Sequence, residues 1–349
     1  MFKINNRVIG ENEPPYIIAE ISANHNGNID NAFAIIDMAK RAGADAVKMQ
    51  TYTPDTITLN SENPDFLITE GLWAGNSLYD LYAKAFTPWE WHADLFAYAK
   101  SKNITIFSTP FDFSAIELLE KLNAPAYKIA SFECIDLPLI RAAASTGKPL
   151  IISTGMANED EIQEAVNTAL EYGSGDLALL HCVSGYPAPA ADYNLRTLVD
   201  MKSRFGTDVG LSDHTLENTT AVAAVAMGAV IIEKHVTLDR AGGGPDDSFS
   251  LEEEGLSDLC IMANTAWASI GKVNYQRTES EKGNVKFRRS LYFVNSLSAG
   301  EIITEKDVRS VRPGFGLAPK YYDQIIGTRV SKSVEKHTPV TKDCLSIEL

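Results

Sequence analysis

The chain has 349 residues, of which 45% are hydrophobic, and 31 basic against 46 acidic side chains give a formal net charge of −15. This length suits one large domain with a smaller one attached, and the hydrophobic share is ordinary for a globular core. So acidic a chain is not expected to bind nucleic acid or an anionic membrane through charge, although a locally basic pocket could still hold an anionic substrate.

The cysteines and the N-terminus favour a reducing, aqueous location. Cys134, Cys182, Cys260 and Cys344 are far apart and form no CxxC pair, so we expect reduced and buried thiols. The first fifteen residues, MFKINNRVIGENEPP, lack the apolar core of a secretion signal, and no apolar run reaches membrane-spanning length. We therefore expect a soluble, cytoplasmic protein.

Apolar, β-branched runs alternate with segments of helical spacing along most of the chain. The runs expected to form strands are 16–22, 46–50, 104–109, 126–131, 150–154, 177–182, 209–214 and 230–237. Helices are expected between them, including 30–43, 88–100, 114–121, 138–146 and 159–172. Eight such units in about 270 residues have the number and size of a (β/α)8 TIM barrel. A doubly wound open sheet is the alternative, but no GxGxxG motif follows the first strand.

Residues 51–87 interrupt this rhythm with a connection that is too long for a plain strand-to-helix loop. The aromatic residues Tyr79 and Tyr82 lie within it, and we expect it to form an excursion on the substrate side of the barrel. Trp73 and Trp89 are expected to serve as packing residues rather than as platforms for a sugar.

The composition and the pattern of apolar residues change after the last expected barrel helix. Residues 271–287 are polar and charged, which indicates a linker. Residues 288–349 contain short alternating runs broken by glycine and proline. We predict a barrel domain over residues 1–270, the linker, and a small C-terminal domain that docking onto the barrel or a second subunit would help to stabilise.

The stretch 209–237 contains the strongest signal for a metal. Two strand-like runs flank an alanine-rich helical segment, and such a crossover makes the strands parallel, with equivalent ends at one edge. His214 closes the first run and His235 the second, beside the acidic residues Asp213 and Glu233. Two imidazoles with carboxylates and water suit a divalent cation such as Mn²⁺ or Mg²⁺. Two unrelated histidines with local hydrogen bonds are the alternative.

Polar residues also gather at the carboxyl ends of the other strands, where the active sites of TIM barrels form. They are Glu20, Asn24, Lys48, Gln50, Ser108, Thr109, Lys128, Ser131, Glu133, Ser153, Thr154, His181, Ser184, Tyr186, Ser212 and Lys234. Lysines in apolar strands are costly to bury without an anionic partner. Hydroxyls around Lys48 and Lys128 favour a cradle for a phosphate and a carboxylate. Salt bridges to Glu20 or Glu233 are the alternative, and Ser108 and Thr109 could instead cap the following helix.

Taken together, the motifs of the chain resemble those of the sialic acid synthase family, over essentially its whole length and in order. They are AEISANHNG, DAVKMQTYTPD, YKIASFE, STGMA, HCVSGYP, GLSDHT and EKHVTLDRAGGGPDDSFSLE, then RRSLY and SVRPGFGLAPKYYDQIIG. The resemblance implies a TIM barrel followed by a small antifreeze-like (SAF) domain. It also implies a transferase that condenses phosphoenolpyruvate with an N-acetylated amino sugar, giving a nine-carbon 2-keto acid and phosphate. One departure is Val183, where the family pattern has threonine.

Three stretches are similar to one branch of the family, whose sugar is 2,4-diacetamido-2,4,6-trideoxy-L-altrose. They are GLW followed by SLYDLY, then GGPDDSFSLE, and RPGFGL in the tail. The branches that make N-acetylneuraminate and legionaminate are the alternatives. The family habit further implies a homodimer with exchanged C-terminal domains.

Matched position by position, the resemblance implies roles for individual residues. His214 and His235 would bind the metal. The substrate-binding residues would be Asn24, Lys48, Gln50, Thr109, Lys128, Ser131, Ser153, Ser184, Ser212, Asp246 and Arg312, the last reaching the sugar in the partner subunit's barrel. The catalytic residues would be Glu20, Glu133, Glu233 and Tyr186. Which of Glu133 and Glu20 acts as the general base is open, and Glu133 is the first choice.

Two hypotheses from other classes remain on the residues alone. A metal-dependent sugar isomerase would normally use several carboxylate ligands, whereas histidines dominate here. A noncatalytic sugar-binding protein has no need for a metal beside two phosphate-facing lysines. Phosphate release that requires phosphoenolpyruvate would separate a synthase from both.

Overall fold

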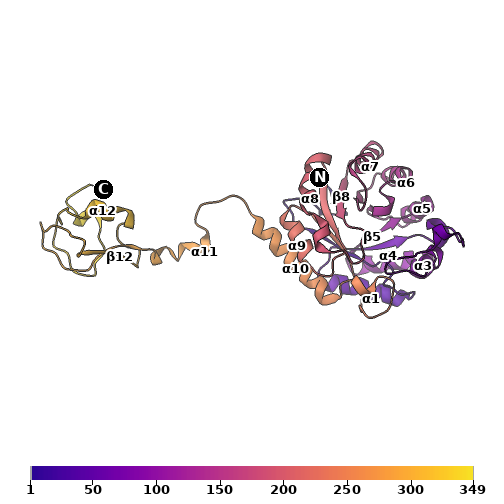
Figure 1. The fold of residues 1–349 in the computed structure, drawn as a ribbon, viewed down its shortest axis with the longest axis horizontal. Coiled ribbons are helices and arrows are strands. Elements are labelled where there is room, and N and C mark those ends of the chain that lie inside the picture. Colours follow the sequence, from indigo (N-terminus) through magenta and orange to yellow (C-terminus); the bar gives the residue numbers. More distant parts are fainter. Residues whose placement is uncertain (1, 349) are drawn as a thin grey trace. The chain divides into compact units, whose positions relative to one another are not determined.

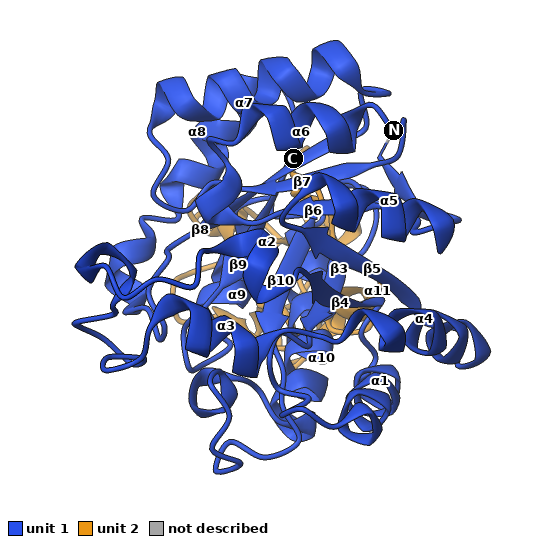
Figure 2. Cartoon of the chain, turned by 90° about the vertical axis from the view of Figure 1, so that its right-hand side faces the viewer, with its two compact units in different colours: residues 1–271 blue, residues 272–349 orange. Residues whose placement is uncertain are grey.

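The computed structural model describes residues 2–348 and divides the chain into two compact units, Met1–Gly271 and Lys272–Leu349 (Figure 2). In the first unit eight parallel strands close into a barrel, and they follow one another around it in chain order, with β10 pairing with β3. The strands are β3 (Tyr16–Glu20), β4 (Ala46–Thr51), β5 (Thr105–Pro110), β6 (Tyr127–Ile129), β7 (Leu150–Ser153), β8 (Leu177–Cys182), β9 (Asp208–Asp213) and β10 (Ile231–His235). The predicted (β/α)8 barrel is confirmed.

Helices surround the strands of this unit (Figure 1). They are α1 (Ile29–Ala42), α4 (His92–Ser101), α5 (Phe113–Lys121), α6 (Leu137–Ala144), α7 (Glu159–Tyr172), α8 (Arg196–Phe205), α9 (Thr219–Ala226) and α10 (Glu253–Ile270). Local signals set their ends: Asn28 caps α1, and Gly43 ends it at a φ of 95°, which glycine adopts without strain. Asp112 caps α5, so the expectation that Ser108 and Thr109 cap this helix is wrong. None of the helices in the described residues is long and apolar enough to cross a membrane.

The long excursion after β4 has structure of its own. It contains α2 (Pro54–Ile57) and α3 (Leu78–Ala85), and Leu67 forms an isolated antiparallel bridge with Ser77. Its base is tied to the barrel by buried polar contacts, in which the hydroxyl of Thr51 lies 2.6 Å from Ser108 Oγ and 2.8 Å from His92 Nε2. The excursion therefore begins from a fixed point on the barrel wall.

The inside of the barrel changes from apolar to polar along its axis. A small hairpin, β1 (Lys3–Ile4) and β2 (Arg7–Val8), brings Phe2, Ile4 and Ile9 into one apolar cluster with inward residues at the amino ends of the strands. Each strand then changes character at its carboxyl end, as where Ile18 is followed by Glu20 on the same face. Apolar packing thus fills the amino end of the barrel, and the buried charged groups gather at the carboxyl end.

The second unit is small and has its own core. Its paired strands β11 (Ser290–Phe293) and β12 (Val308–Val311) are antiparallel, and the short helix α12 (Tyr322–Ile325) follows. Its core consists of Leu291, Phe293, Ile303, Val308, Ile325, Val330, Val340, Cys344 and Leu345. The segment expected to be a linker contains a one-turn helix, α11 (Glu279–Lys282).

A buried ion pair joins β9 to β10 on the outer face of the barrel wall. Lys234 and Asp213 are cross-strand neighbours, and Lys234 Nζ lies 2.7 Å from Asp213 Oδ2. The same ammonium donates to the backbone carbonyls of Thr215 at 2.7 Å and Glu217 at 2.8 Å. Asp213, which the sequence suggested as an acidic neighbour of a metal site, therefore binds Lys234 instead.

Replacing Lys234 by methionine should lower the free energy of unfolding by about 3–5 kcal/mol, because the Asp213 carboxylate would stay buried without its partner. The double variant Lys234→Met, Asp213→Asn should recover most of this loss. Chemical denaturation measures both. Lys102→Met serves as the control, since Lys102 and Asp37 form a partly exposed pair at the surface that should contribute little. A Lys234→Met protein as stable as the parent would contradict a structural role for the pair.

Candidate active site

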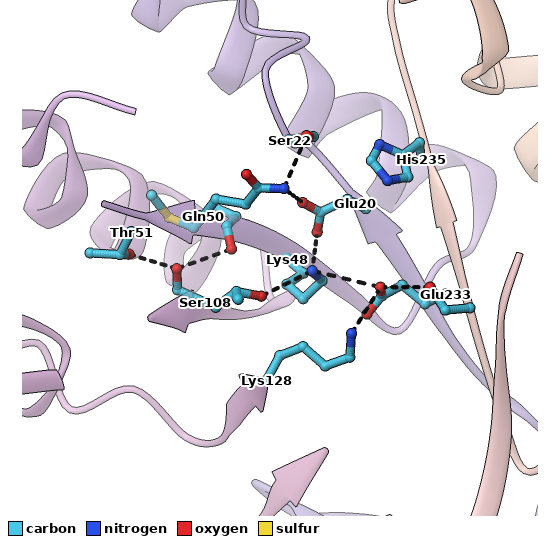
Figure 3. Close-up of polar contacts among 12 residues, drawn as sticks. Glu20, Ser22, Lys48, Gln50, Thr51, Ser108, Lys128, Glu233 and His235 are labelled. Carbon is cyan, nitrogen blue, oxygen red and sulfur yellow. Dashed lines mark hydrogen bonds and ion pairs between the residues drawn. The ribbon is translucent and has the colours of Figure 1, made fainter. Parts of the chain in front are cut away.

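Four buried charges form a network across the polar end of the barrel (Figure 3). Lys48 Nζ lies 2.8 Å from Glu20 Oε2 and 3.6 Å from Glu233 Oε1. Lys128 Nζ lies 3.3 Å from the same Glu233 oxygen. The salt bridges that the sequence left open as an alternative are therefore formed, and two lysines offset two carboxylates.

Burial disfavours each of these charges, and the neighbouring charges offset it unequally. Burial raises the pKa of Glu233, but Lys128 and Lys48 outweigh it and hold that pKa below its ordinary value. Burial lowers the pKa of Lys48, but Glu20 and Glu233 outweigh it and raise the pKa. Burial prevails at the other two residues, raising the pKa of Glu20 and lowering that of Lys128. The four residues thus differ in whether burial or the neighbouring charges determine the direction of the pKa shift.

Hydroxyl and amide groups extend the network on both sides. Lys48 Nζ donates to Thr109 Oγ1 at 3.1 Å, and Ser212 Oγ donates to Glu233 Oε1 at 3.2 Å. Gln50 Nε2 donates to Glu20 Oε1 at 3.1 Å. One carboxylate oxygen, Glu233 Oε2, is buried without a hydrogen-bond partner. The network therefore keeps unused capacity that faces the barrel interior.

Three serines lie at or just after the carboxyl ends of the successive strands β6, β7 and β8. Ser131 Oγ is 2.9 Å from Ser184 Oγ, and the buried Oγ of Ser153 has no hydrogen-bond partner. Gly155 makes the approach possible, because a Cβ there would lie 2.3 Å from Ser131 Cβ and 2.7 Å from Ser184 Oγ. The glycine of the STGMA motif thus leaves room for a close set of hydroxyls.

The two histidines meet at the same end of the barrel. Their ring centroids are 5.5 Å apart, and Tyr186 stacks 4.3 Å from the ring of His214. Burial lowers the pKa of His214 to about 4 and that of His235 well below its ordinary value, so both are neutral at neutral pH. The Val183 carbonyl lies 2.8 Å from His214 Nδ1; a carbonyl can only accept, so Nδ1 carries the proton and Nε2 keeps a free lone pair. His235 Nδ1 is buried without a hydrogen-bond partner.

These features fit a divalent cation held by two imidazoles. Residues 2–348 contain no group of three or more histidine, cysteine or acidic side chains arranged as metal ligands. The remaining ligands would therefore come from water or substrate, as in sites that keep open positions for chemistry.

The loop after β10 is held against the loop that joins β3 to α1. Asp246 Oδ2 accepts a hydrogen bond from Ser22 Oγ at 2.5 Å and lies 3.9 Å from His235 Nδ1. Asn24 Nδ2 donates to Ser250 Oγ and to the Val236 carbonyl, each at 2.8 Å. Asn24 thus acts on the loop as a structural clamp.

Some residues that the sequence singled out point away from the site or belong elsewhere. Ser108, Thr154 and His181 bond within the barrel wall, to Thr51, the Leu180 carbonyl and the Tyr193 carbonyl respectively. Lys234 is the outer ion-pair residue described above. Arg312 is an exposed residue of the second unit, directly after β12, and its role stays a prediction.

Sequence reasoning missed two residues that shape the site. Ser22 links Gln50 to Asp246. It lies just after β3, and its backbone is in the left-handed region, at a φ of 47°. The Tyr193 hydroxyl accepts a hydrogen bond from the backbone N–H of His214 at 2.7 Å. Ser22 lay within a predicted strand, and Tyr193 had no motif around it, so neither gave a local signal.

Lysine, hydroxyl and imidazole groups converge at the carboxyl end of the barrel. TIM-barrel enzymes carry out their chemistry at this end, so the protein belongs to that class of enzymes. A model of the NeuB family matches residues 35–275, and a model of the SAF domain matches residues 288–346. The chain belongs to the NeuB family, the family of the sialic acid synthases, and the resemblance inferred from its motifs is confirmed.

Individual relatives in sequence and in structure are also synthases of this family. The chain is 42% identical to the pseudaminic acid synthase of Helicobacter pylori, over 95% of this chain and 98% of the relative. It is 35% identical to an N,N'-diacetyllegionaminic acid synthase of Campylobacter jejuni, over 92% of this chain and 97% of the relative. A crystal structure of the N-acetylneuraminic acid synthetase of Leptospira borgpetersenii in complex with citrate matches with a TM-score of 0.73 and 32% identity. That match covers 81% of this chain and 94% of the other.

The ionisation of Glu133 should appear in the pH dependence of stability. Burial raises the pKa of Glu133 from 4.5 to about 7, and its Oε2 has no hydrogen-bond partner. The folded protein thus holds the proton of the Glu133 carboxyl more tightly than the unfolded chain does. The free energy of unfolding therefore falls as the pH rises from 4.5 to about 7. Relative to Glu133→Gln, the parent should lose up to about 3 kcal/mol of unfolding free energy. Denaturant titrations across this pH range measure the difference, with Glu164→Gln, at an exposed position of α7, as the control. A pH-independent difference would overturn the assignment.

Proposed function

We propose that the protein is a pseudaminic acid synthase. It condenses phosphoenolpyruvate with 2,4-diacetamido-2,4,6-trideoxy-L-altrose and water, and it releases pseudaminic acid and phosphate. The observation that carries the proposal is the pair of buried lysines, Lys48 and Lys128, among hydroxyls and next to two neutral histidines. The 42% identity to a pseudaminic acid synthase over almost the whole chain supports this choice of sugar.

Phosphoenolpyruvate is a small, highly charged anion, and the site offers it charge and hydrogen bonds. Lys48 and Lys128 bind its carboxylate and phosphate, with the hydroxyls of Ser131, Ser153, Ser184 and Ser212 as further donors. The free Oγ of Ser153 supports this role, because a buried hydroxyl without a partner is costly unless a ligand engages it. As the anion binds, Lys128 and the Ser212 hydroxyl turn from the Glu233 carboxylate toward the substrate.

The amino sugar lies on the histidine side of the site. Gln50, Tyr186 and Asp246 face it, and Asn24 fixes the loop that carries Asp246. Arg312 reaches the N-acyl end of the sugar from the C-terminal domain of a partner subunit, in a homodimer with exchanged domains. His214 and His235 would hold a divalent cation such as Mn²⁺ or Mg²⁺, which when bound supplies a Lewis acid for the open-chain aldehyde.

The chemistry follows from where the chain's residues hold the two substrates. The lysines and serines align phosphoenolpyruvate so that its methylene carbon attacks the aldehyde carbon, and a carbon–carbon bond forms. Carbon 2 becomes electron-poor, and the carboxylates of Glu20 and Glu233 stabilise the positive charge. Glu133 takes a proton from water as the oxygen adds to carbon 2. The new hydroxyl on carbon 2 gives its proton to the departing phosphate as the carbon–oxygen bond breaks, which leaves the keto group and free phosphate. The proton held by Glu133 passes to the oxygen of the former aldehyde, which becomes a hydroxyl.

A panel of three sugars tests the substrate. Phosphate release from phosphoenolpyruvate is measured with Mn²⁺ and the diacetamido-trideoxy-altrose, its legionaminate-pathway counterpart, or N-acetylmannosamine. We expect release with the altrose at a kcat/KM at least about tenfold higher than with the other two. Release with either of the others instead would assign the protein to another branch. No release with any sugar, by protein that still binds phosphoenolpyruvate, would refute the synthase proposal.

The general base can be identified by conservative replacement. Glu133→Gln should lower kcat by about 10²–10⁴-fold with little change in the KM of either substrate. Glu20→Gln should lower kcat less than Glu133→Gln and should also raise the KM for phosphoenolpyruvate, because Glu20 raises the pKa of Lys48 and so keeps its ammonium charged for the anion. Steady-state kinetics measure both, with Glu164→Gln again as the surface control. The opposite pattern would transfer the role of base to Glu20.

A further inference from the structure

Trp73 belongs to the excursion after β4, and two independent contacts hold it at the carboxyl end of the barrel. Its indole Nε1 donates a hydrogen bond to the backbone carbonyl of Pro245 at 3.0 Å. Its ring lies 5.7 Å from the ring of Tyr186, which in turn lies 4.3 Å from His214. Trp73 therefore stands in a row of rings, one ring farther from the histidines than Tyr186.

The contacts of Trp73 determine what it can still offer to a ligand. The indole N–H is its only polar group, and Pro245 already accepts it. The side chain is half-buried, so part of the ring remains accessible. That accessible part can make only apolar contacts. Pro245 also precedes Asp246, a residue that we expect to face the sugar.

We propose that Trp73 forms an apolar wall of the sugar site and selects for a methyl group over a hydroxymethyl group at the end of the sugar remote from the aldehyde. This inference rests on the proposed function, in which the aldehyde carbon lies at His214 and His235. The chain of the sugar then extends past Tyr186 toward Trp73. A hydroxyl against the indole would lose its hydrogen bonds to water and find no acceptor or donor in exchange.

The size of the effect follows from what apolar surfaces achieve in enzymes. An apolar pocket rejects an analogue that merely adds a hydroxyl by up to about 100-fold. We therefore expect the parent enzyme to prefer the 6-deoxy sugar over its 6-hydroxy analogue by about 10- to 100-fold in kcat/KM. Removal of the indole should bring this ratio toward one.

The test compares two sugars that differ at one atom: 2,4-diacetamido-2,4,6-trideoxy-L-altrose and 2,4-diacetamido-2,4-dideoxy-L-altrose. Phosphate release is measured for the full-length parent, Trp73→Ala and Trp73→Phe. Trp73→Ala should lose the preference and raise the KM for the 6-deoxy sugar, while the KM for phosphoenolpyruvate stays unchanged. Trp73→Phe keeps an apolar ring but no N–H group, so it should retain most of the preference.

Trp89 provides a matched control in the same part of the chain. It is also half-buried and donates its indole N–H to a backbone carbonyl, that of Tyr52, at 3.2 Å. In the described chain it is not among the rings that contact Tyr186. Trp89→Ala should therefore leave the preference between the two sugars unchanged.

The outcomes separate this inference from the proposed function. An unchanged preference in Trp73→Ala would overturn the apolar wall while the synthase proposal stands. An equal loss in Trp73→Phe would also overturn it, since the hydrogen bond to Pro245 and not the ring surface would then carry the effect. A parent enzyme that releases phosphate with neither sugar would instead refute the proposed function itself.

Discussion

The network of Lys48, Lys128, Glu20 and Glu233 is the constraint around which the barrel is built. Four charges inside a protein are tolerated only if they neutralise one another and are hydrogen-bonded, because each is expensive to remove from water. The closed barrel meets this condition by bringing β3, β4, β6 and β10 to one end with their charged residues inward. An anionic ligand can replace a carboxylate as the partner of a lysine in such a network. The free-energy cost is modest, because the lysines are already removed from water.

The surroundings of this network divide the site into two chemically different halves. On one side, hydroxyls of Ser131, Ser153 and Ser184 offer hydrogen-bond donors in a space that Gly155 keeps open. On the other side, two neutral imidazoles lie under aromatic rings. The first half suits a small anion and the second a polyhydroxylated carbonyl compound, which matches the two substrates of the proposed reaction. The amino ends of the strands are packed with apolar side chains, and both halves of the site lie at the carboxyl ends.

Rigid supports lie directly behind the reacting groups. The Lys234–Asp213 pair and the Tyr193 hydroxyl hold the backbone on either side of His214, and Ser22 ties Gln50 to Asp246. The groups that face the substrates are less satisfied, as the free polar atoms of Ser153, Glu133, Glu233 and His235 illustrate. Several buried polar atoms without a hydrogen-bond partner thus lie where ligands are expected, while others, such as Tyr16 Oη and Thr207 Oγ1, lie elsewhere in the barrel domain.

The sequence by itself determined the barrel, because eight apolar runs with polar ends and helical segments between them have few other solutions. It also determined that Lys48, Lys128, His214 and His235 converge, since parallel strands place their carboxyl ends at one edge. Only the tertiary structure decided which neighbouring residues face inward. Asp213 and Lys234 lie one residue from Ser212 and Glu233 and yet point outward, because side chains alternate along a strand and barrel closure fixes the inner face. The position of Trp73 likewise depended on the folding of a long excursion, which no local pattern specifies.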